Sequence, residues 1–241
     1  PPRSTLFPYT TLFRSWTSEG AVFLSGVKVG VRTPSPDDLM DRAVAAAATA
    51  DAVVLVVGTN LDWETEGRDR ESMDLPGGQP ELIRRVCAAN GRTVVVVNSG
   101  SVVTSDWAEV APAVLQAWFG GQEMADALVD VLVGDDEPSG RLPTTMPHRL
   151  EDTPAFLSYP GENGRVAYSE GLFTGYRWYE ARRLPVAFPF GHGLGYTSFT
   201  WGEPSLGEIP SIAELEAGAT VTVTVPVTND GDRAGSEVVQ C

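Results

Sequence analysis

Three short, mostly apolar runs, two of them rich in β-branched residues, constrain the fold of this chain more than any other feature. The runs cover residues 52–57, 93–97 and 113–119. A run of this kind, in which apolar and polar residues do not alternate, is typical of a strand buried on both faces of a sheet. Sequence with a strong helical pattern covers residues 37–50, 80–90 and 124–134. Strands and helices that alternate in this way predict an α/β fold with a doubly wound, mostly parallel sheet.

The first run leads directly into a loop that is dense in carboxylates. Four acidic residues lie within eight positions, Asp62, Glu64, Glu66 and Asp69. In open α/β sheets, ligands bind beyond the carboxyl ends of the strands. The same topology brings residues 98–101 and 120–123 to this edge, so we expect three segments to form one site. The spacing of the carboxylates leaves a solvated acidic loop open as the alternative.

The charge of the chain excludes several classes of partner. The formal net charge is -15, from 32 acidic against 17 basic residues. Nucleic acids and anionic membrane surfaces bind basic proteins, so neither is expected as a partner. No apolar run approaches the roughly 18 residues of a membrane helix. A neutral ligand fits this composition best.

The residues that bind metals and cofactors are scarce. The chain has two histidines, His148 and His192, and two cysteines, Cys87 and Cys241. This supply makes a structural zinc site or a disulfide framework unexpected. The acidic loop lacks the spacing of a calcium loop, and the glycines at 191–195 do not open a helix as a dinucleotide-binding motif would. We therefore expect no metal and no cofactor. Cys87 is expected to be a buried structural thiol, and Gly91 is expected to terminate the helix that carries it.

Carboxylate chemistry is the remaining interpretation of the acidic loop. A glutamate beside Trp63 can have its pKa raised by desolvation and can then donate a proton. Aromatic rings next to carboxylates also suit sugars, whose C–H faces stack on indoles. Hydrolysis of a glycoside with retention uses two carboxyl groups about 5–5.5 Å apart. Neighbours on one loop rarely face each other across a sugar, so we expect the second carboxylate to come from elsewhere.

The two ends of the chain differ from its centre. Residues 1–15 fit nothing that follows, and we expect them to be a non-native leader. Residues 16–32 contain one alternating strand, which we interpret as the remnant of an upstream β module. Residues 159–195 are rich in glycine, proline and aromatics, which is typical of a long structured loop. From residue 219 the sequence alternates strictly, which predicts a strand that opens a β-sandwich left incomplete at residue 241. The few cysteines favour a cytoplasmic protein without deciding its location.

Several long motifs resemble one enzyme family. They are W-E-T-E-G-R-D-R at 63–70, V-V-V-V-N-S-G-S at 94–101, L-Q-A-W-F-G-G-Q-E at 115–123, G-R-L-P-T-T-M-P at 140–147 and F-P-F-G-H-G-L-G-Y at 188–196. Together they resemble the C-terminal α/β-sandwich domain of glycoside hydrolase family 3, the β-glucosidase family, over residues 33–200. Residues 201–241 resemble the opening of that family's fibronectin type III-like domain.

The resemblance implies a retaining β-glycosidase that acts on β-glucosides or oligosaccharides. It places the general acid/base on Glu66, and Asp69 and Arg70 are expected to hold the shape of the loop. Trp63 and Glu64 are expected to contact substrate, with Glu64 as a rival proton donor. The family's nucleophile is an aspartate in an N-terminal (β/α)8 barrel that lies outside this sequence, so the isolated chain is expected to be inactive. A non-catalytic carbohydrate-binding or scaffold domain, and a β-xylosidase-type member of the family, are the alternatives.

Overall fold

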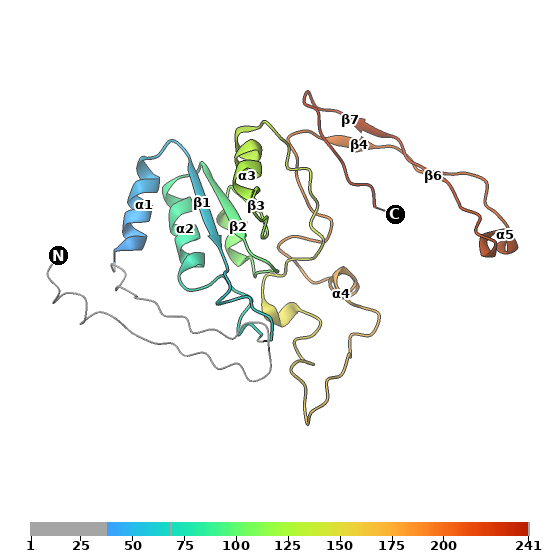
Figure 1. Cartoon of the computed structure of the whole chain (residues 1–241), viewed down its shortest axis with the longest axis horizontal. Helices are drawn as coiled ribbons and strands as arrows, with labels where there is room; N and C mark the ends of the chain where they lie inside the picture. Colours follow the sequence, from blue (N-terminus) through green and yellow to red (C-terminus); the bar gives the residue numbers. More distant parts are fainter. Residues whose placement is uncertain (1–37, 68, 241) are drawn as a thin grey trace. The chain divides into compact units, whose positions relative to one another are not determined.

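The structure is a computed structural model that describes residues 38–67 and 69–240 (Figure 1). The segments 1–15 and 16–32, for which the sequence predicts a leader and a strand remnant, lie outside the described residues. The chain divides into two compact units between Phe119 and Gly120. Within the described residues no helix combines the length and the apolar character needed to cross a membrane.

The first unit is built on a three-stranded parallel sheet. Its strands are β1 (Val53–Gly58), β2 (Thr93–Asn98) and β3 (Ala113–Gln116), in the order β1-β2-β3. Val57 pairs with Val97, which in turn pairs with Gln116. All three strands therefore end at one side of the sheet, which we call the carboxyl edge. The predicted α/β fold with a parallel sheet is confirmed.

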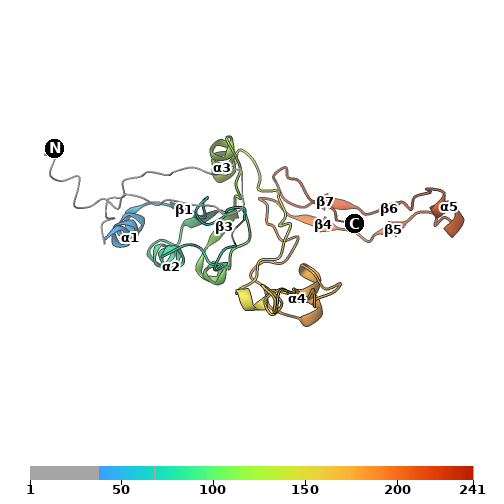
Figure 2. The same ribbon diagram turned by 60° about the horizontal axis from the view of Figure 1, so that its bottom comes forward.

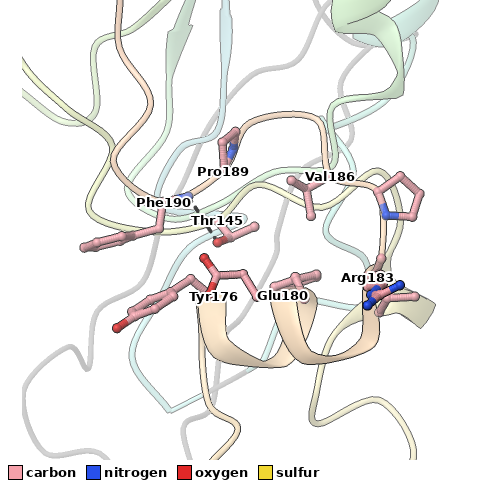
Figure 3. Close-up of a pocket in the computed structure, with 10 residues that line it drawn as sticks. Thr145, Tyr176, Glu180, Arg183, Val186, Pro189 and Phe190 are labelled. Atoms are coloured by element: carbon pink, nitrogen blue, oxygen red, sulfur yellow. Dashed lines mark hydrogen bonds between the residues drawn. The ribbon is translucent and has the colours of Figure 1, made fainter.

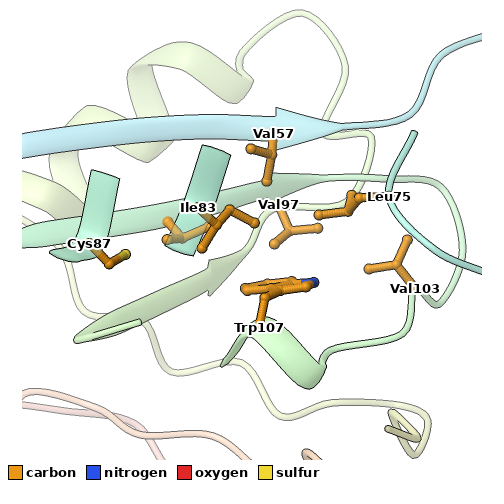
Figure 4. Close-up of a cluster of buried hydrophobic side chains, with 8 residues drawn as sticks. Val57, Leu75, Ile83, Cys87, Val97, Val103 and Trp107 are labelled. Atoms are coloured by element: carbon orange, nitrogen blue, oxygen red, sulfur yellow. The ribbon is translucent and has the colours of Figure 1, made fainter. Parts of the chain in front are cut away.

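The core of this unit lies between the sheet and two helical segments. The helix α2 (Gln79–Ala89) and the 3-10 helix η2 (Asp106–Val110) pack on each other, and α1 (Leu39–Thr49) packs on α2. The buried cluster comprises Val57, Leu75, Ile83, Cys87, Val95, Val97, Val103 and Trp107. Figure 4 shows the Trp107 ring, contributed by η2, below the strands. Its buried Nε1 donates to Thr104 O at 3.0 Å, so the indole is packed without leaving its donor unpaired.

The prediction that β1 is buried on both faces is wrong. Leu55 and Val57 face the core, but Val54 and Val56 on the opposite face are 52% and 57% exposed. In the central strand β2, by contrast, Val96 has no exposed surface. The difference follows position in the sheet, since β1 lies at one end of the strand order formed by the described residues and β2 lies at its centre. A run of β-branched residues does not distinguish between these two places.

The ends of α1 and α2 are joined by Asn90. The predicted termination of α2 at Gly91 is wrong, because the C-cap is Asn90, in an extended conformation. The Asn90 side chain explains this, since its Nδ2 donates to Ala47 O at 2.9 Å and to Ala50 O at 2.7 Å at the end of α1. Cys87 is buried as predicted, and burial raises the pKa of its thiol.

The second unit contains less regular structure. Its helical segments are α3 (Met124–Val133), η3 (Leu150–Asp152), α4 (Tyr176–Arg182) and α5 (Ile212–Glu216). The helix α4 lies inside the segment predicted to be a loop, so that prediction is wrong at these residues. A tertiary contact helps to explain the helix, because Trp178 Nε1 donates to Asp152 O at 3.0 Å. Within the helix, Arg182 also stacks 3.9 Å from the Trp178 ring, one turn away.

Two short antiparallel pairs end the described chain. The strand β4 (Phe199–Trp201) pairs with β7 (Val227–Asn229), and β5 (Ser205–Leu206) pairs with β6 (Val223–Thr224). Figure 2 shows them as a narrow ribbon with α5 at its tip. The single strand predicted from residue 219 is thus two strands with different partners. Pro226 stands at the break, because proline has no N–H for a ladder.

Candidate active site

The acidic loop after β1 begins with a tight turn around Asn60. The backbone N–H groups of Trp63 and Glu64 donate to Asn60 O at 2.9 and 2.8 Å, and that of Asp62 donates to Asn60 Oδ1 at 2.9 Å. The turn reverses the chain, so the Glu64 side chain reaches back to Thr59 at the end of β1.

Glu64 joins the acidic loop to the turn that follows β2. Its Oε1 accepts from Thr59 Oγ1 and from Gly100 N, the latter at 3.1 Å. Its Oε2 accepts from Ser101 Oγ at 3.1 Å. The loops after β1 and β2 therefore meet at the carboxyl edge, as the parallel topology predicts. The third segment expected there, residues 120–123, belongs to the second unit.

A second anchor lies on the other side of Glu66. Arg70 Nη2 donates to Val102 O at 2.8 Å, one residue beyond Ser101. Its Nη1 is buried and has no hydrogen-bond partner in the part of the chain that the structure describes. Farther along, Thr104 N donates to Met73 O at 2.9 Å. The segment after Glu66 is thus tied to the same stretch of chain as Glu64.

Glu66 itself is exposed between these two anchors. Across residues 38–67 and 69–240 its carboxylate makes no hydrogen bond and no ion pair. Gly67 follows in the left-handed backbone conformation, with φ of 81°, which lets the chain turn sharply after the glutamate. Asp69 is also exposed, whereas Trp63 is partly buried with its Nε1 unpartnered among the described residues. Among the described residues, the structure therefore presents the Glu66 carboxylate exposed and unpaired on an anchored loop.

Polar side chains that the sequence analysis did not single out also shape the carboxyl edge. Gln79, the first residue of α2, accepts from Gly58 N at 2.7 Å and donates to Gly58 O at 2.9 Å. Gln116 Nε2 donates to Ser99 Oγ at 3.2 Å, and this hydroxyl donates to Ser101 O at 2.9 Å. The available signal was a glutamine at the end of an apolar strand, where a valine or leucine would be usual.

An aromatic surface adjoins the Glu64 carboxylate. A Cβ atom on Gly100 would lie 2.5 Å from Glu64 Oε2 and 2.7 Å from Phe119 Cε2, so these two side chains flank the glycine. The Phe119 ring is half exposed. Trp118, just before it, has φ of 55°, a conformation that bulky residues rarely adopt and that is often found at functional sites. Both aromatics follow β3, so all three strand ends contribute to this region.

A cavity of about 360 Å³ lies in the second unit, and none of the predicted site residues is among its lining residues (Figure 3). Tyr176 and Phe190 stack at one end of it, with ring centroids 4.9 Å apart, and Arg183 lies at the other end. Glu180 is the one carboxylate among its lining residues. Retaining hydrolysis requires two carboxyl groups, so this cavity does not provide that chemistry. Over the described ranges, His, Cys, Asp and Glu side chains form no group of three that could hold a metal ion.

The sequence is similar to known β-glucosidases. The model for the glycosyl hydrolase family 3 C-terminal domain matches residues 8–196. A probable β-glucosidase I of Aspergillus clavatus is 49% identical over 209 residues, which are 87% of this chain and 25% of that protein. A β-glucosidase of Rhizobium radiobacter is 47% identical over 222 residues, 90% of this chain and 26% of that protein. The chain thus spans about a quarter of the length of these curated relatives.

Solved structures agree with this relationship. The crystal structure of a Kluyveromyces marxianus β-glucosidase in complex with glucose matches with a TM-score of 0.77 and 43% identity, over 86% of this chain and 24% of that one. A β-glucosidase 3B of Thermotoga neapolitana in complex with glucose matches with a TM-score of 0.71 and 29% identity, over 85% and 29%. The chain therefore belongs to glycosyl hydrolase family 3, whose C-terminal domain it contains.

Proposed function

We propose that the chain is the C-terminal part of a retaining β-glucosidase, in which Glu66 is the general acid/base. The observation that carries this proposal is the position of Glu66, exposed and unpaired among the described residues, on a loop anchored at the carboxyl edge of a parallel sheet. The names of the relatives support the substrate class, terminal β-D-glucosyl residues. A free carboxyl group on a fixed loop is what proton transfer to a bound sugar requires.

The proposed reaction is a double displacement. Glu66 protonates the leaving oxygen while a second carboxylate attacks the anomeric carbon, and Glu66 then takes a proton from the water that releases the sugar. The relatives are more than three times as long as this chain, and we propose that the second carboxylate comes from an N-terminal (β/α)8 barrel of the same polypeptide.

The other predicted residues have supporting roles in this proposal. Trp63 offers an indole beside the loop for contact with a sugar ring, and Asp69 and Arg70 hold the shape of the loop. The bond from Arg70 to Val102 O supports the role of Arg70. We also propose that residues 33–200 form a doubly wound α/β-sandwich. The antiparallel pairs β4–β7 and β5–β6 support a fibronectin type III-like assignment for residues 201–241.

Turnover of an aryl β-glucoside tests the proposal. The 241-residue chain alone should show no appreciable turnover, and robust turnover abolished by Glu66→Gln would contradict the need for a second carboxylate from elsewhere.

In the complete polypeptide, Glu66→Gln should lower kcat on a poor leaving group by about 10²–10⁴-fold, the usual contribution of general acid/base catalysis. The matched control is Glu71→Gln, which alters an exposed carboxylate of the same loop. Equal activity of the two variants would exclude Glu66 as the acid/base. Comparing aryl β-glucosides with aryl β-xylosides decides between the two sugar classes.

A non-catalytic carbohydrate-binding domain is the second candidate function. The half-exposed Phe119 ring beside Trp63's loop favours it, because exposed aromatic rings bind sugars by stacking. Titration of the chain with cellobiose separates the two functions. The binding domain would be favoured by two results together. Cellobiose binding by the chain would survive Glu66→Gln but be lost in Trp63→Ala, and the complete polypeptide would show no turnover.

A further inference from the structure

We propose that Glu64 is a positioning residue for Glu66, which fixes the acidic loop to the turn after β2 and itself neither exchanges a proton nor contacts the sugar. This inference rests on the proposed role of Glu66 as the general acid/base. We call the three hydrogen bonds that Glu64 accepts from Thr59, Gly100 and Ser101 the Glu64 brace.

The brace occupies most of the bonding capacity of the Glu64 carboxylate. An ionised carboxylate has about four acceptor positions. Three are used by donors of the protein, two at Oε1 and one at Oε2. The donors come from two strand ends, because Thr59 follows β1 whereas Gly100 and Ser101 follow β2. A side chain engaged in this way connects two segments and is poorly placed to bind a third group.

The brace matters for Glu66 because the two residues are two positions apart. Glu66 has no hydrogen bond or ion pair of its own among the described residues, so its place is set by the backbone on either side. On one side the brace holds the chain, and on the other Arg70 is bonded to Val102 O. A displacement of about 1 Å in a catalytic group can lower a rate by about 10²-fold. Loss of the brace should therefore act on the proton transfer.

Gly100 shows how closely the brace is fitted. Because its Cβ would lie 2.5 Å from Glu64 Oε2, even an alanine at this position displaces the carboxylate. The same Cβ would lie 2.7 Å from Phe119 Cε2, so the new methyl group is crowded by this ring as well. Gly100→Ala therefore disturbs the brace without altering Glu64 and tests it independently.

A glutamine at position 64 distinguishes bracing from proton transfer. Its amide oxygen can accept from Thr59 and Gly100, and its NH₂ can donate to Ser101 Oγ, since a hydroxyl both donates and accepts. Glu64→Gln therefore preserves the brace but removes the titratable proton. Glu64→Ala removes both.

The experiment uses the complete polypeptide and two aryl β-glucosides, one with a good and one with a poor leaving group. For Glu64→Ala and Gly100→Ala we expect kcat on the poor leaving group to fall by about 10- to 100-fold, with a smaller fall on the good one and little change in KM. The kcat of Glu64→Gln should stay within about threefold of that of the wild type.

Glu71→Gln is the control for the removal of a charge from the same loop. Ser101→Ala, which removes a single bond of the brace, keeps the test valid if Glu64→Ala does not fold, and should give a smaller loss of the same pattern.

Three results would overturn the proposal. The first is a Glu64→Gln variant as inactive as Glu64→Ala, which would assign Glu64 the proton itself. The second is a Glu64→Ala variant indistinguishable from Glu71→Gln. The third is a loss that appears entirely in KM, which would make Glu64 a substrate contact. Failure of the proposed function has a different signature, because Glu66→Gln would then keep full activity whatever the Glu64 variants do.

Discussion

The strand β2 and the segment 155–174 are both rich in large apolar residues, yet their environments are opposite. In β2, Val95 and Val96 have no exposed surface. In the segment 155–174 of the second unit, Leu157 is 93% exposed and Tyr168 is 83% exposed. The β2 residues follow one another in a strand that has partners on both sides, whereas glycines and one proline separate the apolar residues of the other segment. Apolar content thus builds a core only where the backbone forms an element that can pack.

The largest difference between the two regions should appear on removal of an aromatic side chain. Trp107 is buried in the core of the first unit, so Trp107→Ala should lower the free energy of unfolding by about 3–5 kcal/mol. Tyr168→Ala, at an exposed position, should change it by less than about 0.5 kcal/mol. Urea unfolding of each variant, followed by circular dichroism, measures both values. A Tyr168→Ala variant as unstable as Trp107→Ala would contradict this contrast between a buried and an exposed aromatic ring.

A second contrast concerns two glycines, one closely packed against backbone and one with open space around it. A Cβ on Gly58, at the end of β1, would lie 1.9 Å from the backbone oxygen of Asn98, whereas one on Gly140 would meet nothing within 4 Å. Gly58→Ala should therefore destabilise the chain by about 1–3 kcal/mol through steric strain. Gly140→Ala should be neutral or slightly stabilising, because alanine restricts the unfolded chain. Thermal melts of the two variants check this, and a neutral Gly58→Ala would contradict the tight fit at the carboxyl edge.

For ion pairs the contrast between the two units is the opposite, since the more buried pair lies in the second unit. Arg141 and Glu237 are 2.9 Å apart with side chains 13% and 16% exposed, whereas Arg84 and Asp106 in the first unit are 2.7 Å apart with 40% and 60%. Arg141→Ala should lower the free energy of unfolding by about 2 kcal/mol, because it leaves a shielded carboxylate without its partner. Arg84→Ala should cost less than about 1 kcal/mol, as exposed pairs do. Equal losses would show that shielding is irrelevant here.

The smallest expected effect is a pH dependence from the same pair. The hydrogen bond from Arg141, followed by that from Val238 N–H, lowers the pKa of Glu237. Because the folded-state pKa lies below the unfolded one, the stabilisation is present above the ordinary glutamate pKa of about 4.3 and is lost as the pH falls through the folded value. The stability of the wild type should therefore fall more steeply below about pH 4.3 than that of Glu237→Gln. Urea midpoints measured at several pH values test this, and parallel curves would refute it.

The sequence was sufficient for the parallel sheet and for the meeting of two loops at its carboxyl edge. Both follow from the order of strands and helices, which the apolar runs indicate from neighbouring residues alone. The exposure of Val54 and Val56 could not be predicted in the same way, because an edge strand and a central strand have similar sequences. The helix α4 depends on the contact of Trp178 with Asp152, and such contacts between distant residues leave no local pattern.

For the candidate site, the motif around Glu66 predicts this residue as the general acid/base, and the structure adds that its carboxylate is exposed. The partners of Glu64 were not predictable, since Gly100 and Ser101 lie more than 30 positions away in the sequence. Gln79 was missed for the same reason, because its bonds to Gly58 arise only when α2 packs beside the end of β1.

Azide rescue of Glu66→Ala in the complete polypeptide tests the central claim most directly. With an activated aryl β-glucoside, this variant should form the glycosyl-enzyme but release it slowly, because no base deprotonates the attacking water. Azide needs no base, so it should accelerate release and yield β-glucosyl azide, with no such product from the wild type or Glu71→Gln. A folded Glu66→Ala variant whose rate and products are unchanged by azide would contradict the assignment of Glu66 as the general acid/base.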